Sequence, residues 1–203
     1  MEKRNGWVGR REVENRLSGE RIVIKTSSAE SGGASMVFDL YLKPGGGVEF
    51  SHYHAIRSEI LRMKRGELLI TLGNGETKRL RAGDELELPP GTVHSLVNDT
   101  PEEVYFEGEY RPGLGSDEWF MKVHAAEDQL GRNLTLIELA PHLSEEVDTY
   151  PAKPSRWVVR VTVAMLAVIS RMIGKDRVIL EAADAWHRAR GSSPELNALD
   201  LAR

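Results

Sequence analysis

Short runs of alternating hydrophobic and polar residues fill the chain from about residue 22 to residue 110. The clearest run covers residues 36–43, where every second residue is apolar and one face of a strand would be hydrophobic. Two further runs, residues 67–72 and 76–81, are joined through Gly73-Asn74-Gly75, and Asn-Gly is a strong signal for a hairpin turn. Many short strands without helices between them predict a β-sandwich or a closed barrel rather than β-α-β units.

After Pro112 the spacing of apolar residues becomes that of helices. We expect a short helix over residues 116–129 and two more over residues 155–173 and 175–188, with a loop-rich connection around Pro141, Pro151 and Pro154. The pattern divides the chain into a β-barrel with N-terminal strands over residues 1–113 and a mainly helical extension over residues 114–203. This extension is expected to pack on the barrel or on a partner subunit.

The helix expected at residues 155–173 is the most apolar segment of the chain. Arg160 and Arg171 leave too short an apolar run to cross a bilayer, which needs about 20 residues. A wide apolar face beside a thin basic stripe is compatible with a membrane surface, but such a face is more often buried against protein. We therefore expect it to pack within the chain or in a homodimer rather than on a membrane.

Composition and charge narrow the function classes. The 203 residues include no cysteine, so disulfides and thiolate metal sites are excluded, and any metal must be held by nitrogen and oxygen. A formal net charge of −4 argues against nucleic acid as a partner, because nucleic acid requires a basic surface. The N-terminal residues are charged throughout and do not resemble a signal peptide, which predicts a cytoplasmic protein.

Three of the six histidines fall in a pattern with one glutamate. His52 and His54 are two residues apart, so both project from the same face of a strand. Glu59 has the wrong parity for the same strand, so the chain must turn near residues 55–57 and return Glu59 on the next strand of a hairpin. His94 follows a Pro-Pro-Gly turn near the start of another strand.

Imidazole nitrogens with one carboxylate suit a divalent transition metal better than calcium or magnesium. The four residues therefore predict a site for one metal ion, and iron, manganese, nickel, copper and zinc are all compatible with it. His124, His142 and His187 lie outside this pattern and are expected to be surface or packing residues, with His142 in a loop.

Two stretches of the sequence resemble the two cupin motifs. Residues 46–66 read Gly-x5-His-x-His-x4-Glu-x6-Gly, and residues 83–98 read Gly-x5-Pro-x-Gly-x2-His-x3-Asn, with every motif position filled. The resemblance implies an all-β double-stranded β-helix, the jelly-roll cupin barrel, which is often dimeric and holds a metal inside. It assigns His52, His54, Glu59 and His94 as the metal ligands, and the motif glycines, Pro89 and Asn98 as structural positions.

Strand parity also predicts a mainly apolar pocket around the metal. The predicted pocket residues are Phe38, Leu40, Phe50, Arg57, Leu61, Met63, Leu96 and Asn98. Arg57 is either a clamp for a substrate carboxylate or a solvated residue of the turn. No further histidine is expected inside, which speaks against sugar-phosphate isomerases that need an additional acid or base.

These patterns lead to two functional hypotheses. The first is a metalloenzyme of the dioxygenase, cyclase or isomerase type that acts on a small, largely apolar organic substrate, with Glu59 as the catalytic base. A metal-dependent oxidoreductase of the dioxygenase kind is one form of it. The second is a non-enzymatic cupin that binds or senses a small ligand, with the helical extension as its output or assembly surface.

Overall fold

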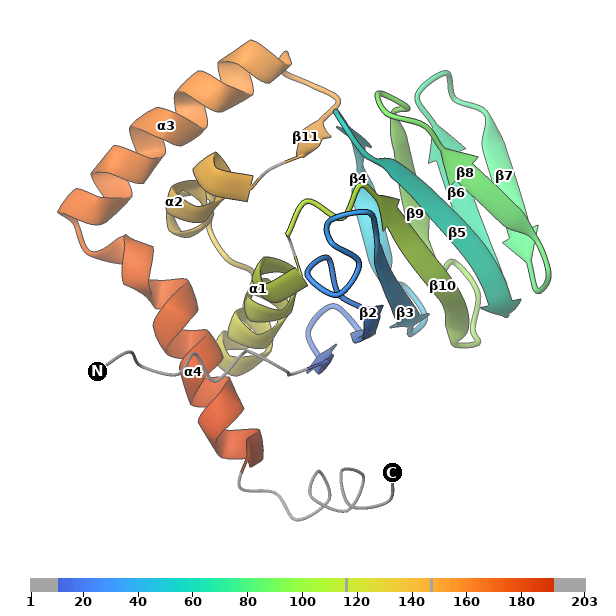
Figure 1. Ribbon diagram of the computed structural model, residues 1–203, viewed down its shortest axis with the longest axis horizontal. Coiled ribbons are helices and arrows are strands. Elements are labelled where there is room, and N and C mark those ends of the chain that lie inside the picture. The colour runs from blue at the N-terminus through green and yellow to red at the C-terminus, as the bar shows by residue number, and fades with distance from the viewer. Residues whose placement is uncertain (1–10, 116, 147, 192–203) are drawn as a thin grey trace.

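The computed structural model describes residues 11–115, 117–146 and 148–191, and within them two antiparallel sheets lie face to face (Figure 1). The six-stranded sheet has the order β1 (Glu12–Asn15), β2 (Glu20–Thr26), β3 (Met36–Leu42), β10 (Val104–Arg111), β5 (Ser58–Arg65) and β8 (Glu85–Leu88). The five-stranded sheet has the order β11 (Thr149–Pro151), β4 (Gly47–His54), β9 (His94–Val97), β6 (Glu67–Leu72) and β7 (Thr77–Arg81). The predicted jelly-roll barrel is confirmed.

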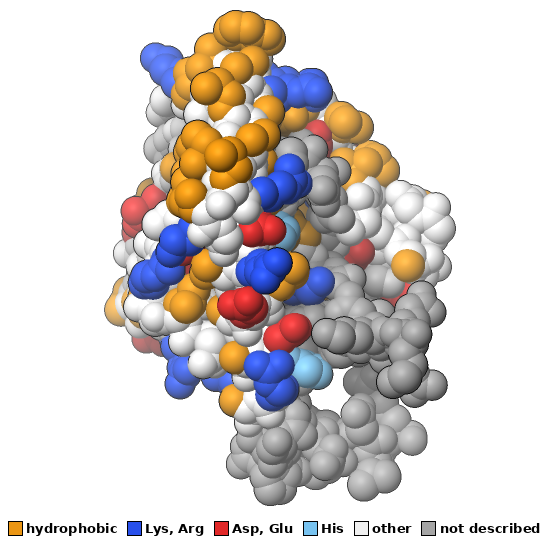
Figure 2. All heavy atoms as spheres, turned by 90° about the vertical axis from the view of Figure 1, so that its left-hand side faces the viewer, with side chains coloured by type: hydrophobic (Ala, Val, Ile, Leu, Met, Phe, Trp, Pro, Cys, Tyr) orange, Lys and Arg blue, Asp and Glu red, His pale blue; other side chains and the backbone are white. Residues whose placement is uncertain are grey.

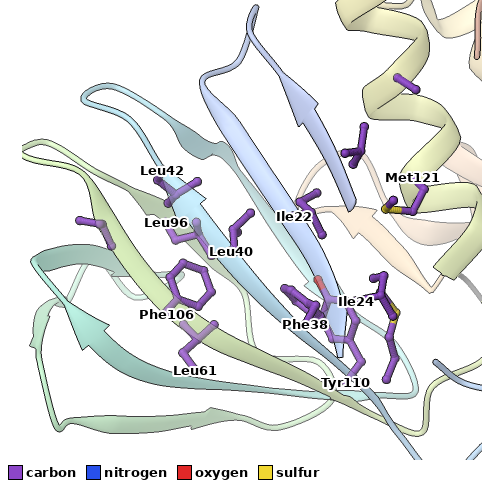
Figure 3. Close-up of a cluster of buried hydrophobic side chains, with 14 of the residues drawn as sticks. Ile22, Ile24, Phe38, Leu40, Leu42, Leu61, Leu96, Phe106, Tyr110 and Met121 are labelled. Atoms are coloured by element: carbon purple, nitrogen blue, oxygen red, sulfur yellow. The ribbon is translucent and has the colours of Figure 1, made fainter. Parts of the chain in front are cut away.

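The alternating run of residues 36–43 forms β3, and its apolar residues point into the core as predicted. Burial along β3 alternates strictly, and Phe38 is only 1% exposed (Figure 3). Space for the Phe38 ring exists because Gly108 lies opposite it on β10. A Cβ atom at Gly108 would lie 2.4 Å from the Phe38 ring, so the strand requires glycine there.

In the described part of the chain, four α-helices follow the barrel: α1 (Asp117–Leu130), α2 (Leu136–Glu146), α3 (Arg156–Met172) and α4 (Val178–Gly191), with a short 3-10 helix η1 (Lys175–Arg177) before α4. The sequence predicted three of the four. It missed α2, because Pro141 lies inside that helix and was interpreted as marking a loop. An interior proline costs about 3 kcal/mol, but Ala140 and Leu143 of α2 pack against Val163 of α3, and this burial holds the helix in place.

Helices α1 and α4 share a hydrophobic core with the barrel. Met121 and Ala125 of α1 and Ile179 and Ala183 of α4 are buried in the same cluster as the residues of the sheets. Trp186 of α4 adds a hydrogen bond, since its indole N–H donates to Asp128 Oδ2 over 2.8 Å. The extension therefore packs on its own barrel.

Helix α3 leaves most of its apolar surface exposed. Its inner face is buried against α2, whereas Trp157, Met165 and Met172 on the outer face are 73%, 63% and 79% exposed. Figure 2 shows a band of apolar side chains on the side of the molecule that carries α3, with basic side chains beside it. The predicted packing of this helix within the chain is therefore present only along its narrow inner side.

Among the described residues, no single helix is long and apolar enough to cross a membrane. Helix α3 and the helical segment after it pass such a test only as a pair, and a bend of 101° separates them.

Candidate metal centre

Strand ends bring His52, His54, Glu59 and His94 to one place. His52 and His54 lie at the end of β4, and His94 begins β9 directly opposite His52 in the ladder. Glu59 lies on β5, which belongs to the other sheet. The predicted turn at residues 55–57 is present, but it carries the chain from one sheet to the other and does not close a hairpin. Glu59 therefore faces the histidines across the barrel interior.

The four side chains converge on a common point. One potential ligand atom from each lies within 4.8 Å of those of the others, and the four residues are 1–4% exposed. Glu59 Oε2 lies 3.1 Å from His54 Nε2 and 3.0 Å from His94 Nε2. The sequence prediction that these residues meet inside the barrel agrees with this geometry, and the cluster could hold a metal ion.

The outer nitrogen of each imidazole has its own partner. His52 Nδ1 lies 3.0 Å from Phe50 O, and His94 Nδ1 lies 2.9 Å from Thr92 O. A carbonyl oxygen only accepts hydrogen bonds, so both Nδ1 atoms donate and both Nε2 atoms can present a lone pair to the centre. His54 Nδ1 lies 3.1 Å from the hydroxyl of Thr149. Such outer partners fix the tautomer and ring orientation of metal-binding histidines.

Burial and the short contacts shift the pKa values of the cluster. For Glu59, burial alone would raise the pKa, but the hydrogen bonds from His54 and His94 outweigh it and hold the pKa below its ordinary value. For His94, burial alone would lower the pKa, but the hydrogen bond to Glu59 outweighs burial and raises the pKa above its ordinary value. Burial and the nearby His94 lower the pKa of His52 to about 4, so this imidazole is neutral at pH 7.

The donor set fits a divalent transition metal. Three imidazoles and one carboxylate provide nitrogen and oxygen donors without thiolates, and they are buried in a barrel rather than on an acidic surface. Without a cation, the ionised Glu59 is balanced only by protons on its histidine neighbours. A metal ion would replace those protons and meet all four side chains at once.

Arg57 is not the solvated turn residue that was one of its two predicted roles. It is buried at 5% exposure, its Nε lies 3.4 Å from Asp148 Oδ2, and its guanidinium carbon lies 4.4 Å from the centre of the Tyr110 ring. Its backbone N–H also donates to Asp148 Oδ2 over 2.9 Å. The guanidinium is thus a buried partner of Asp148 and not a solvated turn residue, and its predicted role as a substrate clamp stays a prediction.

The other predicted pocket residues divide between the core and the rim. Those in the packed barrel core are Phe38, Leu40, Leu61, Met63 and Leu96. Phe50 is 58% exposed because the β4–β9 pairing is irregular between Val48 and His52, which breaks the assumed parity. Its ring still lies 5.1 Å from that of His52, so it stands at the edge of the site.

Asn98 is a structural residue, as the resemblance implied, and not a lining residue. Its amide group donates to the carbonyls of Leu42 and Glu102, and its Oδ1 accepts a hydrogen bond from Thr100. These contacts use the amide group to hold the turn after β9.

The other histidines lie outside the centre. His124 is packed in α1, where its Nε2 lies 2.9 Å from Glu20 Oε2. His142 lies in α2 and not in a loop, stacked on Trp119 at 5.2 Å. Because α2 continues through Pro141, His142 lies on a helix rather than in a loop, and its ring packs against that of Trp119.

Sequence reasoning missed the contribution of the extension to the site. Residues 149–151 form β11, which pairs with β4 so that Thr149 lies opposite His54. The hydroxyl of Thr149 is the partner of His54 Nδ1. Asp148 holds the turn after β4 in two ways: its carboxylate pairs with Arg57, and its backbone carbonyl accepts a hydrogen bond from the backbone N–H of Ala55. A three-residue strand that ends in a proline carries too little alternation to be recognised in a sequence.

With this geometry established, comparison with known proteins places the fold. The family model described as the cupin domain matches residues 38–106. The chain contains a cupin domain. The match covers the strands that carry all four candidate ligands and ends before the helical extension. No curated protein matches the chain significantly.

Several solved structures resemble the cupin domain. An uncharacterised protein with a double-stranded β-helix domain from Klebsiella pneumoniae is 24% identical, with a TM-score of 0.41, over 53% of this chain and 82% of that one. KdgF from Halomonas sp. is 20% identical, with a TM-score of 0.43, over 51% and 86%. A cupin-superfamily sugar phosphate isomerase from Silicibacter pomeroyi is 23% identical, with a TM-score of 0.41, over 50% and 69%. At these scores, the assignment depends on the family model and the two motifs.

Proposed function

We propose that the cupin domain binds one divalent transition metal ion through His52, His54, Glu59 and His94, and that the protein is a metalloenzyme for a small organic substrate. The observation that supports this most directly is the arrangement of the imidazoles. The Nδ1 atom of each is held by a partner outside the centre, and the ligand atoms of all four residues gather within 4.8 Å. Outer partners of this kind are the ones that hold metal-binding histidines in position, with the other ring nitrogen directed at the ion.

When bound, the metal would supply Lewis acidity toward an oxygen atom of the substrate. The remaining chemistry belongs to the side chains of the chain. Glu59 is the one carboxylate of the cluster, and it is the side chain that we nominate to accept a proton from the substrate. The apolar core around the centre excludes water and favours an apolar substrate body. This arrangement is compatible with dioxygenation, cyclisation or isomerisation.

Metal analysis tests the first half of the proposal. Protein purified without an affinity tag should contain close to one equivalent of a transition metal after loading, measured by elemental analysis. The His52→Ala/His54→Ala variant should lose it, whereas His187→Gln, which changes a histidine outside the centre, should retain it. Equal metal content in all three proteins would contradict the assignment of the site.

Accessibility of the metal tests the second half. Cobalt-loaded protein should change its visible absorption spectrum when azide is added, because an enzyme centre keeps a position open to small molecules. A spectrum that stays constant up to high azide concentration would show a closed, structural site. The same titration on the His52→Ala/His54→Ala variant gives the background.

A ligand-binding or sensing role is the second candidate, and the exposed outer face of α3 favours it because this face offers a surface for a partner. Deletion of residues 155–203 would not test it cleanly, since Ile179 and Ala183 belong to the shared core. The double variant Met165→Lys/Met172→Lys instead alters only exposed side chains and leaves the shared core intact. If the predicted homodimer uses this face, light scattering should show a dimer for the wild type and a monomer for this variant. The cytoplasmic location stays a prediction.

A further inference from the structure

A cavity of about 660 Å³ lies outside the barrel, between the turn after β4, β11, α2 and α3. Ile56, Leu136, Leu143 and Val159 give it apolar walls, and Tyr150 supplies an aromatic one. None of the four candidate metal ligands lines it. Its volume falls in the range of about 300–1,000 Å³ that is typical of small-molecule sites. The cavity is therefore a separate place for a ligand.

Positive charge gathers on one wall of this cavity. Arg156 and Arg160 lie four residues apart at the start of α3, so they share one face of the helix and both line the cavity. The Arg156 guanidinium carbon lies 4.7 Å from the centre of the Tyr150 ring. Within the described residues, neither arginine forms an ion pair with a carboxylate, although a hydrogen bond to Tyr150 and the charge of Asp148 raise the pKa of Arg156; the first turn of α3 contains no acidic residue. The positive end of the helix dipole adds to this field, so the wall suits an anion.

Asp148 provides a hydrogen-bond acceptor, whereas the two arginines provide donors. Its side chain is 1% exposed and lines the cavity, and its Oδ2 is occupied by Arg57. Its Oδ1 is buried, and no described residue donates a hydrogen bond to it. A buried acceptor without a donor is unfavourable, so a small rotation of the Asp148 side chain toward a hydroxyl in the cavity would be favoured. Because Arg57 balances the charge of Asp148, this carboxylate can accept a neutral donor without repelling an anion strongly.

We propose that this cavity is a second ligand site that takes a small organic anion with an apolar body and one hydroxyl group. The anionic group would lie at Arg156 and Arg160, the apolar body between α2 and α3, and the hydroxyl at Asp148 Oδ1. The site is independent of the metal proposal, because its charged contacts come from α3 and from the segment before β11. It is adjacent to the metal centre, because Thr149 lines the cavity and also contacts His54.

The test uses 4-hydroxyphenylacetate as the probe, in calorimetric titrations of the full chain. Two matched compounds test the two polar contacts separately. The compound 4-hydroxyphenylacetamide lacks the negative charge expected at the arginines, and phenylacetate lacks the hydroxyl expected at Asp148. We expect saturable binding of the probe, with each matched compound at least tenfold weaker. Equal affinity for the probe and its amide would overturn the proposed arginine contact, and with it the site.

Variants locate the binding. Arg156→Gln/Arg160→Gln should weaken the probe at least tenfold, while Arg171→Gln/Arg177→Gln removes the same charge outside the cavity and should stay within twofold. Ala164→Trp keeps every charge but fills part of the cavity and should abolish binding; circular dichroism checks that each variant is folded. Binding that survives Ala164→Trp but is lost in His52→Ala/His54→Ala would place the probe at the metal centre and refute the second site. Metal content, measured separately, decides the proposed function whatever the outcome here.

Discussion

Replacement of Thr149 by valine tests whether the extension tunes the metal centre. Valine keeps the β-branched shape of threonine on β11 but removes the hydroxyl that lies 3.1 Å from His54 Nδ1. A net hydrogen bond of this kind contributes about 0.5–1.5 kcal/mol. Since about 1.4 kcal/mol corresponds to a tenfold change in an equilibrium constant, metal affinity should fall by about 2- to 13-fold. Loss of an outer partner of a metal-binding histidine costs about 10- to 100-fold in other proteins, so the upper part of this range is expected.

The assay is competition for cobalt between the protein and a coloured chelator at constant pH. Thr149→Ser retains the hydroxyl and serves as the matched control, so its affinity should stay within about twofold of the wild type. The argument fails if Thr149→Val binds cobalt as the wild type does. It fails equally if Thr149→Ser loses as much affinity as valine, because the methyl group and not the hydroxyl would then be responsible.

Three further predictions concern stability. Asp148→Asn leaves the buried Arg57 without its counter-charge and should cost about 3–5 kcal/mol in urea unfolding, whereas Arg57→Met combined with Asp148→Leu should recover much of this loss. Gly108→Ala should cost about 1–3 kcal/mol because its Cβ would collide with the Phe38 ring, and Phe38→Leu in the same chain should recover part of it; additive losses would refute the explanation. His124→Gln should cost about 1–3 kcal/mol at pH 6 and clearly less at pH 9; equal losses would refute it.

The sign of that pH dependence follows from the two partners. Burial would lower the pKa of His124, but its hydrogen bond to Glu20 raises it above 6.5, so this stabilisation is complete below pH 6.5 and is lost as the pH rises through the folded value. Burial would raise the pKa of Glu20, but its hydrogen bond to His124 lowers it below 4.5, so its contribution is lost only in acid. The pair therefore stabilises the fold most between about pH 5 and pH 6.5.

Local pattern was enough to predict a β-sandwich or barrel and a candidate cluster of three histidines and one glutamate, and the resemblance to the cupin motifs added the jelly-roll arrangement and the assignment of the ligands. Residues that alternate along one strand, such as Phe38 on β3, and turns beside His54 and His94 leave a signal within a few positions. Phe50 was misplaced because parity assumes a regular ladder, and the pairing of β4 with β9 is irregular just before His52. The contacts of Thr149 join segments far apart in the chain, which no local period can reveal.

Tertiary packing explains the other differences. Pro141 normally ends a helix, yet α2 continues through it because its apolar side rests on α3. Arg57 looked like a group open to solvent or substrate, but contacts with the distant residues Asp148 and Tyr110 make its burial favourable.

The pairing of β11 with β4 has a consequence for how the protein is made. His54 and Thr149 are separated by 95 positions, so the edge of the ligand-bearing strand stays open during synthesis until the segment after α2 has emerged. Contacts this distant form late in folding, and an unpaired strand edge promotes aggregation until it is covered. A fragment that ends at residue 113 would keep that edge permanently, so we expect it to aggregate even though it contains all four candidate ligands.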